Sequence, residues 1–225
     1  MRVLLINPPC LNEISADDPT FIGKERGFNP PLGLLYLAGY LKNKGRHQVF
    51  GLDAQVEGFG YNDKFRQRIK EINPEAVGIR AMTFTLIDVL KTIDLIKEIE
   101  KNLNKKNLII LGAPHVHLFP QETIKLKNVD FLIKGEGEVS LFYLLEALEG
   151  RGQLKDIQGL VYQKEGEIID NPVGDFIENL DELPFPDRKL LPVKKYNSVL
   201  GGGRIVTTMF TSRGCPYQCA FCDRP

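Results

Sequence analysis

The feature that most constrains the fold of this chain is a regular alternation of short apolar runs and longer amphipathic segments over its first 150 residues. The apolar runs are typical of strands that are buried on both faces of a sheet. They read RVLLIN, HQVFGLDA, AVGIRAM, NLIILGA and VDFLIKG in chain order. Five strands that alternate with helices predict an α/β fold, in which a parallel sheet carries helices on both faces.

The amphipathic segments have recognisable helix ends. The first stops at Gly45, and the next stops before Pro74, which cannot continue a helix. The longest, residues 85–104, has an apolar stripe along one side, which is typical of a helix that packs on a sheet. A last amphipathic segment ends at Gly150 and closes the predicted α/β unit.

The pattern changes after residue 150. Two strand-like runs flank Lys164-Glu165-Gly166 and predict a β-hairpin. Pro184, Pro186 and Pro192 interrupt the next stretch, which we expect to be a linker. A β-rich run at residues 204–211 then leads to the cysteines. The predicted units are an α/β domain, a hairpin with a linker, and the start of a further domain: residues 1–150, 151–203 and 204–225.

Composition narrows the classes of function. The chain has 29 basic and 29 acidic residues, a balance that argues against a nucleic-acid or anionic-membrane partner. Its longest apolar run, near residues 34–41, is far shorter than the ~20 residues that span a bilayer. The N-terminus does not have the apolar stretch of a signal peptide. We therefore expect a cytoplasmic protein, in which clustered cysteines are metal ligands or catalytic thiols before disulfides.

Three of the four cysteines, Cys215, Cys219 and Cys222, lie within eight positions. Thiolates at this spacing are typical ligands of iron–sulfur clusters, and three of them leave one iron of a [4Fe–4S] cluster without a protein ligand. Zinc is the second interpretation, but a structural zinc site needs four ligands, and no His or further Cys follows in the sequence. Three unrelated thiols, or an adventitious disulfide, is the third interpretation.

This cysteine motif, preceded by Ser212-Arg213-Gly214, resembles the cluster motif of radical S-adenosylmethionine (SAM) enzymes. The resemblance implies that Cys215, Cys219 and Cys222 hold a [4Fe–4S] cluster whose open iron binds SAM. It also implies that Phe221 contacts the adenine of SAM, and that the preceding run is the first strand of an incomplete radical SAM barrel. In that family, electron transfer from the cluster cleaves SAM to methionine and a 5′-deoxyadenosyl radical.

Upstream motifs resemble the subgroup of these enzymes that carries an N-terminal cobalamin (B12)-binding domain. They are Asn7-Pro8-Pro9 and the runs NPPLGLLYLAGYL, LGAPH, FLIKGEGE and LDELPFPDR. The resemblance implies a flavodoxin- or Rossmann-like, doubly wound, parallel five-stranded sheet with cobalamin over the C-terminal ends of its strands. Open α/β sheets in general bind ligands at that edge.

The loops after the expected strands supply the candidate cobalamin contacts. Glycine lets the backbone approach a ligand closely, and threonine hydroxyls donate hydrogen bonds. Ordinary turn and helix-capping roles are the alternative for each residue. The candidates are Asn7, Pro8, Pro9, Thr83, Thr85, Gly112, Ala113, Pro114, His115, Gly135 and Glu136.

Some positions depart from common cobalamin domains. Many of these domains carry an Asp-x-His-x-x-Gly motif after the first strand, where this chain has no His. Gln55 stands in an imitation of the motif after the second strand, which we interpret as coincidence. Arg80, on the third strand, replaces an expected small hydroxyl residue, and a buried Arg needs a partner, so we expect it to face the lower side of the cofactor or to pair with a carboxylate. No third ligand is evident beside His115 and His117, so we expect His115 to line the cofactor pocket or to cap a turn after Pro114. We expect Glu138 to lie at the positive end of a helix dipole.

The leading hypothesis is the N-terminal part of a cobalamin-dependent radical SAM enzyme, which transfers a methyl group to an unactivated carbon or rearranges bonds there. The alternatives are a non-catalytic cobalamin- or nucleotide-binding module, and a radical SAM enzyme whose N-terminal domain has lost cobalamin. The expected partners are a small-molecule substrate and a reductant such as flavodoxin or ferredoxin. Because α/β barrels need about 200 residues, we expect a truncated chain with little or no catalysis of its own.

Overall fold

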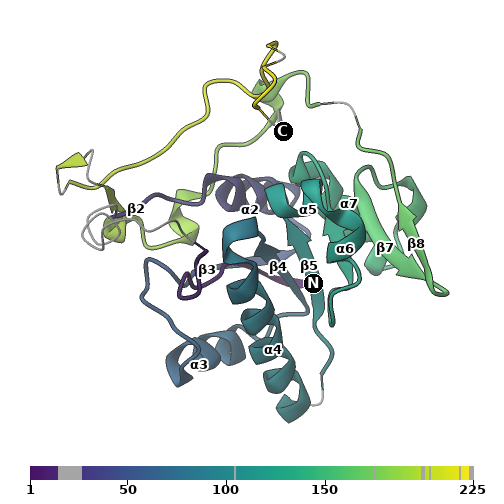
Figure 1. Ribbon diagram of the computed structural model, residues 1–225, viewed down its shortest axis with the longest axis horizontal. Helices are drawn as coiled ribbons and strands as arrows, with labels where there is room; N and C mark the ends of the chain where they lie inside the picture. Colours follow the sequence, from purple (N-terminus) through teal and green to yellow (C-terminus); the bar gives the residue numbers. More distant parts are fainter. Residues whose placement is uncertain are drawn as a thin grey trace.

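The fold is built on one seven-stranded sheet with the strand order β3-β1-β4-β5-β6-β7-β8 (Figure 1). This computed structural model describes residues 1–14, 27–103, 105–174, 176–198, 201–202, 204–217 and 219–222. The first five strands of that order are mutually parallel. When these five strands are numbered by their succession in the chain, their order in the sheet is 2-1-3-4-5. This is the flavodoxin-like order, so this part of the prediction is confirmed. Their bounds are β1 Arg2–Asn7, β3 Gln48–Asp53, β4 Ala76–Arg80, β5 Leu108–Gly112 and β6 Phe131–Ile133.

Helices cover both faces of the sheet, as the alternating pattern predicts (Figure 1). One face carries α2 (Leu32–Lys44) and α7 (Gly137–Leu148), which pack against each other. The other face carries α3 (Asp63–Ile72) and α4 (Leu86–Leu103). Three short helical segments complete the α/β unit: η1 Thr83–Thr85, α5 Pro114–Leu118 and α6 Pro120–Thr123.

Strand β1 supplies side chains to both layers of the core. Val3 and Leu5 belong to the cluster under α2 and α7, whereas Leu4 and Ile6 belong to the cluster under α3 and α4. All four side chains are fully buried or nearly so. Successive strand residues point to opposite faces, so a continuous apolar run is required where both faces are covered.

The helix ends follow from local chemistry. Helix α2 ends at Gly45, whose positive φ of 69° suits glycine. Helix α3 begins at Asn62, whose side chain accepts a hydrogen bond from the backbone N–H of Phe65. Asn73 ends the same helix in a left-handed conformation just before Pro74. Both stops coincide with those that the sequence predicts.

The predicted hairpin belongs to the sheet. Strands β7 (Leu160–Lys164) and β8 (Glu167–Asp170) pair antiparallel, and β7 pairs antiparallel with β6. Glu165 and Gly166 both have positive φ and form the two-residue turn. The prediction of five strands is therefore wrong in number, because the hairpin pairs with the edge of β6 that a five-stranded sheet leaves open. The domain boundary at residue 150 stays a prediction, since the sheet continues beyond it.

The strand expected at residues 204–211 is not formed. In the part of the chain that the structure describes, Ile205 makes one isolated bridge to Asn197, and the following residues form no ladder. A strand requires a hydrogen-bonded neighbour along its length, and Asn197 is the only one that the described residues provide. Asn197 lies in β9 (Asn197–Ser198), which pairs with β2 (Gly27–Phe28) in a separate two-stranded sheet.

The predicted linker lies against the α/β domain. It contains three short 3-10 turns: η3 Leu180–Glu182, η4 Arg188–Leu190 and η5 Val193–Lys195; a fourth turn, η2 Leu154–Asp156, precedes the hairpin. The backbone N–H of Asp187 donates to the carbonyl of Leu35 on α2 at 2.9 Å. Leu191 and Tyr196 are buried against Leu32 and Leu35. No described helix is both long enough and apolar enough to cross a membrane.

This close packing gives a first prediction. A Cβ added at Gly39 on α2 would lie 2.5 Å from the carbonyl oxygen of Phe185, whereas one added at Gly33 on the same helix meets nothing within 4 Å. Gly39→Ala is expected to lower the free energy of unfolding by about 1–3 kcal/mol in a urea titration, because the linker must move away. Gly33→Ala is the matched control and is expected to leave stability unchanged or slightly higher. Equal stability of the two variants would contradict the observed packing.

Candidate functional site at the C-terminal edge of the sheet

The loops that carry the candidate cobalamin contacts follow parallel strands, so they lie at one edge of the sheet. Backbone hydrogen bonds join neighbouring loops there. The N–H of Ala54 donates to the backbone carbonyl of Asn7 at 2.9 Å, and the N–H of Ala81 donates to the backbone carbonyl of Gly112 at 2.8 Å. The N–H of His115 donates to Ala81 at 3.3 Å. The edge includes the junction of β1 and β4, where the strand order reverses, which is the place where open α/β sheets bind ligands.

Thr83 and His115 meet across two of these loops. The Thr83 Oγ1 lies 3.1 Å from the Nδ1 of His115. Burial lowers the pKa of His115 below its ordinary value, and its ring packs on Phe119. His117, in contrast, is exposed, so the two histidines do not converge. The structure thus pairs His115 with a hydroxyl and gives no pair of histidine ligands.

The loop after β5 is strained at Ala113. Its φ of 91° and ψ of 177° lie in a region that is almost restricted to glycine. Pro114 follows directly and begins α5. The preceding residue, Gly112, would tolerate a Cβ, since the nearest atom to it is the carbonyl oxygen of Ile133 at 3.8 Å. The packing of the chain therefore gives no reason for a glycine at position 112.

A buried polar network lies beneath the edge. The Nδ2 of Asn7 donates to Asp53 at 2.9 Å, and the hydroxyl of Tyr196 donates to the other carboxylate oxygen at 2.8 Å. Burial and the neighbouring Asp53 raise the pKa of Tyr196, so its hydroxyl stays protonated. Pro8 and Pro9 are also buried. The side chain of Asn7 is thus used within the protein, and no sequence pattern indicated its link to Tyr196.

Arg80 lies at the end of β4, beside this network. Its Nη1 donates to the Oδ1 of Asn7 at 3.3 Å. Burial lowers the pKa of the guanidinium, whereas the charge of Asp53 opposes this shift. The hydrogen-bond partner of Arg80 is therefore the side chain of Asn7, which in turn donates to Asp53. The amide of Gln55 donates to the carbonyl of Pro8 at 3.1 Å, an internal contact.

The other candidates of this set have internal contacts. Thr85 is buried, and its hydroxyl donates to the carbonyl of Met82 at 3.3 Å, so it does not cap a helix, which would require its oxygen to accept from a backbone N–H. Gly135 has a φ of 68°, which explains glycine there as a turn residue. Glu136 accepts hydrogen bonds from the N–H of Ile177 and from Arg213. Cobalamin contacts for Thr85, Gly135 and Glu136 stay predictions.

Asp88 anchors the loop after β1. Its carboxylate is fully buried and accepts hydrogen bonds from the N–H groups of Leu11 and Asn12 and from the hydroxyl of Tyr61. Although burial opposes ionisation, hydrogen bonds from Tyr61 and Asn12 lower the pKa of Asp88. An acidic residue in the apolar stripe of the helix at residues 85–104 is the one signal that could have indicated this role.

Exposed apolar side chains surround the same loops. Phe84 and Ile14 are neighbours, because the Ile14 N–H donates to the Phe84 carbonyl at 3.0 Å. Phe119 lies against His115, whose ring contacts Thr83. Exposed apolar groups that gather at one place mark a ligand or interaction site. We call this set the apolar rim: Leu11, Ile14, Phe84, Leu118 and Phe119.

Cys215, Cys219 and Cys222 lie in one exposed loop, and none is in a disulfide. The N–H of Cys222 donates to the carbonyl of Cys219 at 3.2 Å, so the second half of the motif is a tight turn. Phe221 is also exposed. Among the described residues, the three thiols do not form a group whose ligand atoms lie within 4.8 Å of one another, so they do not bind a single ion as placed.

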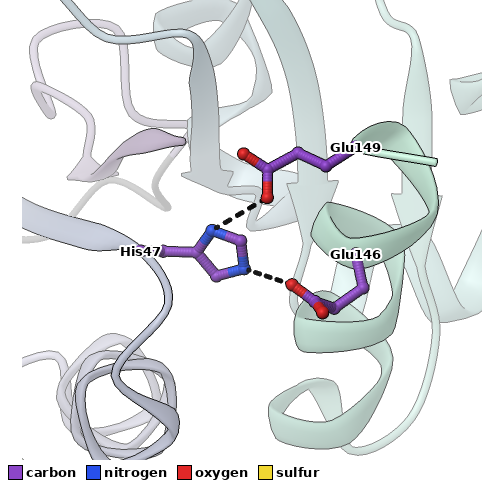
Figure 2. Close-up of side chains that lie close together, drawn as sticks. All are labelled: His47, Glu146 and Glu149. Atoms are coloured by element: carbon purple, nitrogen blue, oxygen red, sulfur yellow. Dashed lines mark ion pairs between the residues drawn. The ribbon is translucent and has the colours of Figure 1, made fainter. Parts of the chain in front are cut away.

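One other group of possible metal ligands lies elsewhere. His47, Glu146 and Glu149 meet at the C-terminal end of α7, with the His47 Nε2 3.3 Å from Glu146 (Figure 2). Positive charges already balance the two carboxylates: Arg151 pairs with both, Arg46 pairs with Glu146, and the N-terminal amine pairs with Glu149. The hydrogen bonds of Arg151 and Arg46 hold the pKa of Glu146 at about 2. The group is therefore an ion-pair network that holds the start of β3 to the end of α7.

His47 gives a second prediction, on pH dependence. Its side chain is fully buried, and burial, together with the N-terminal charge, lowers its pKa below 6.5. The unfolded chain therefore binds more protons than the folded chain as the pH falls below about 6.5, so acid lowers stability in that window. We expect His47→Gln to reduce this pH dependence of the free energy of unfolding between about pH 7.5 and 5. The exposed His117→Gln is the control, and an unchanged slope in the His47 variant would refute the assignment.

The chain is similar to known proteins along nearly its whole length. The B12 binding domain family matches residues 20–144. An uncharacterized methyltransferase of Pyrococcus horikoshii is 34% identical over 99% of this chain and 45% of its own length. The anaerobic magnesium-protoporphyrin IX monomethyl ester cyclase of Rubrivivax gelatinosus is 30% identical over 100% of this chain and 39% of its own length.

A solved structure has the same fold. The cobalamin-dependent S-adenosylmethionine radical enzyme OxsB, with aqua-cobalamin and S-adenosylmethionine bound, matches with a TM-score of 0.78 at 23% identity. The match covers 98% of this chain and 28% of that chain. The chain thus spans less than half the length of each of these relatives.

Proposed function

Because this chain belongs to the B12 binding domain family, we propose that the C-terminal edge of its sheet binds cobalamin and that its cysteine loop holds a [4Fe–4S] cluster with SAM. The reaction is methyl transfer to an unactivated carbon of a small molecule, or bond formation or rearrangement at such a carbon. One curated relative is named a methyltransferase and another a cyclase, which is why both outcomes belong to the proposal.

The observation that carries the cobalamin assignment is the open, apolar character of the edge at the junction of β1, β4 and β5. The apolar rim exposes side chains that a flat macrocycle would cover. Gly112 has no packing reason to be glycine, and the strained Ala113 follows it. Strain of this kind persists where the surroundings enforce it, commonly at ligand sites. These two residues would let the backbone of the β5 loop lie close to the ligand.

The polar residues of this edge would orient the ligand. The hydroxyl of Thr83 and the ring of His115 are preorganised by their mutual contact. Asn7, itself bonded to Asp53, accepts a hydrogen bond from Arg80 at the end of β4, and Arg80 brings a positive charge to the junction. Gln55 is engaged with Pro8, so the axial histidine of the common motif has no substitute at this position.

The cysteine loop fits an iron–sulfur cluster by the chemistry of its donors. Cys215, Cys219 and Cys222 offer exposed thiols, and a cluster spreads its ligands over separate irons instead of one ion. When bound, such a cluster supplies the electron that cleaves SAM. The exposed ring of Phe221, beside Cys222, would contact the adenine of SAM.

Two alternatives differ from this proposal in the cofactors that they require. A non-catalytic cobalamin or nucleotide carrier binds its ligand at the same edge and needs no cluster. A radical SAM enzyme with a domain that has lost cobalamin keeps the cluster and binds no corrin. Metal content therefore separates all three.

The third prediction concerns metal content. After anaerobic reconstitution with iron, sulfide and hydroxocobalamin, we expect about four irons per chain, one cobalt per chain and corrin absorbance bands. A variant with all three motif cysteines changed to Ser should lose the iron and keep the cobalt, because the two sites are formed by different segments. Cys10→Ser is the matched control and should keep both metals.

Each departure from that result selects an alternative. Cobalt without iron would favour the non-catalytic carrier, and iron without cobalt would favour the domain that has lost cobalamin. Iron that persists in the triple Ser variant would mean adventitious binding and would overturn the cluster assignment.

The fourth prediction concerns Gly112. We expect Gly112→Ala to leave the free energy of unfolding nearly unchanged, since a Cβ there meets only ordinary contacts. The same change should weaken hydroxocobalamin binding about tenfold or more, because one displaced contact of about 1.4 kcal/mol has that effect. Gly152→Ala, at a position where a Cβ also meets only ordinary contacts, is the control. Unchanged affinity in the Gly112 variant would argue against close approach of the corrin to the β5 loop.

A further inference from the structure

The segment that precedes the cysteines, residues 204–213, is attached to the linker at its beginning. The N–H of Val206 donates to the carbonyl of Tyr196 at 3.2 Å. Arg188 donates to the hydroxyl of Thr207 at 2.5 Å and to the carbonyl of Thr208 at 2.6 Å. These contacts hold the first half of this pre-cysteine segment, which crosses above α2 (Figure 1).

The last charged residue of the pre-cysteine segment, Arg213, forms ion pairs at the start of α7. The Nη1 lies 2.8 Å from Glu136, and the Nη2 lies 2.7 Å from Glu138, so one guanidinium bridges two carboxylates. The side chains of Arg213 and Glu138 are only 19% and 6% exposed. Ion pairs in such positions are screened less by salt than surface pairs, and removal of one partner leaves charge unpaired. Both carboxylates also lie at the positive end of the α7 dipole.

Aromatic rings contact the same guanidinium. The Cζ of Arg213 lies 5.0 Å from the ring centre of Tyr36 on α2 and 5.9 Å from that of Phe210. The two rings are stacked with their centres 5.9 Å apart. Arg213 therefore connects α2, α7 and its own segment at one point. A lysine cannot reproduce this, because it lacks the planar fork that pairs two acids and stacks on rings.

Beyond this point the chain is exposed. Gly214 has a φ of 77° and turns the backbone towards Cys215, and the three motif cysteines are exposed. Within residues 211–217 and 219–222, Arg213 alone makes hydrogen bonds to the α/β domain. The position of the cysteine loop relative to the sheet thus depends on a side chain two residues before its first ligand.

We infer that Arg213 is a positioning residue that fixes the cysteine loop against the cobalamin-binding edge. Glu136 lies in the loop after β6, which belongs to that edge, so the contact sets where the loop lies relative to it. The role of Arg213 in placing a cluster near the corrin rests on the proposed function. The attachment of the loop to α7 does not, and it can be measured on the metal-free chain.

The test is a distance measurement between two spin labels. One label is attached to Cys215 and the other to position 143 on α7 (Tyr143→Cys), where the side chain is exposed. The other three cysteines are changed to Ser in the full chain. With Arg213 present we expect one narrow distance distribution in double electron–electron resonance. Arg213→Gln is expected to broaden it about twofold or more, because the released loop samples many positions.

Three further variants make the result specific. Arg213→Lys is expected to broaden the distribution to an intermediate degree, because an ammonium pairs with one carboxylate. Changing both Glu136 and Glu138 to Gln should act as Arg213→Gln does, and it tests the same contact if the Arg213 variant fails to fold. Arg204→Gln removes an exposed charge from the same segment and should leave the distribution narrow.

A distribution that stays narrow in both Arg213→Gln and the double Glu variant would overturn the inference, as would equal broadening in Arg204→Gln. The iron content of the Arg213→Gln chain with its cysteines intact then distinguishes the attachment of the loop to α7 from the binding of a cluster. We expect it to retain iron, since the thiols are unchanged. If the unsubstituted chain itself binds no iron, the proposed function fails, whereas the distances still decide whether Arg213 attaches the loop.

Discussion

The hydrogen-bonded ladder of β1 is the constraint on which the rest of the structure depends. β1 pairs in parallel with β3 on one side and β4 on the other, and its side chains reach both layers of the core. A strand in this position cannot shift by one residue without exchanging the two layers. Its register therefore sets the level at which the loops after β1, β3 and β4 leave the sheet, and with it the level of the candidate site.

Buried carboxylates attach the segments that leave this edge. Asp88 holds the loop after β1, Asp53 holds Tyr196 of the linker, and Glu138 with Glu136 holds Arg213. In each case a carboxylate in or beside the α/β unit satisfies donors that are far away in sequence. Hydrogen bonds to ionised groups are stronger than neutral ones, so a few such contacts can order long irregular stretches that have little core of their own.

The fold leaves two sets of side chains exposed, which suit the two binding roles proposed above. The apolar rim and the hydroxyl of Thr83 lie at the loops of the sheet, and the free thiols lie in the loop that follows Arg213. The apolar rim and the thiols lie outside the two core layers that cover the sheet. Exposed groups without a packing role are the ones from which binding sites are built. In the proposed function, the first set contacts cobalamin and the second holds the iron–sulfur cluster.

The sequence by itself determined the α/β class, the helix stops at Gly45 and before Pro74, the hairpin turn at Gly166 and the cysteine motif, because each depends on local periodicity, backbone preference or ligand spacing. Only the tertiary structure decided that the hairpin extends the sheet, that residues 204–211 form no strand, and that Tyr196 and Arg213 bind carboxylates more than 70 residues away in the chain. Such contacts depend on which surfaces the folded core brings together, and no pattern within a short window of sequence encodes them.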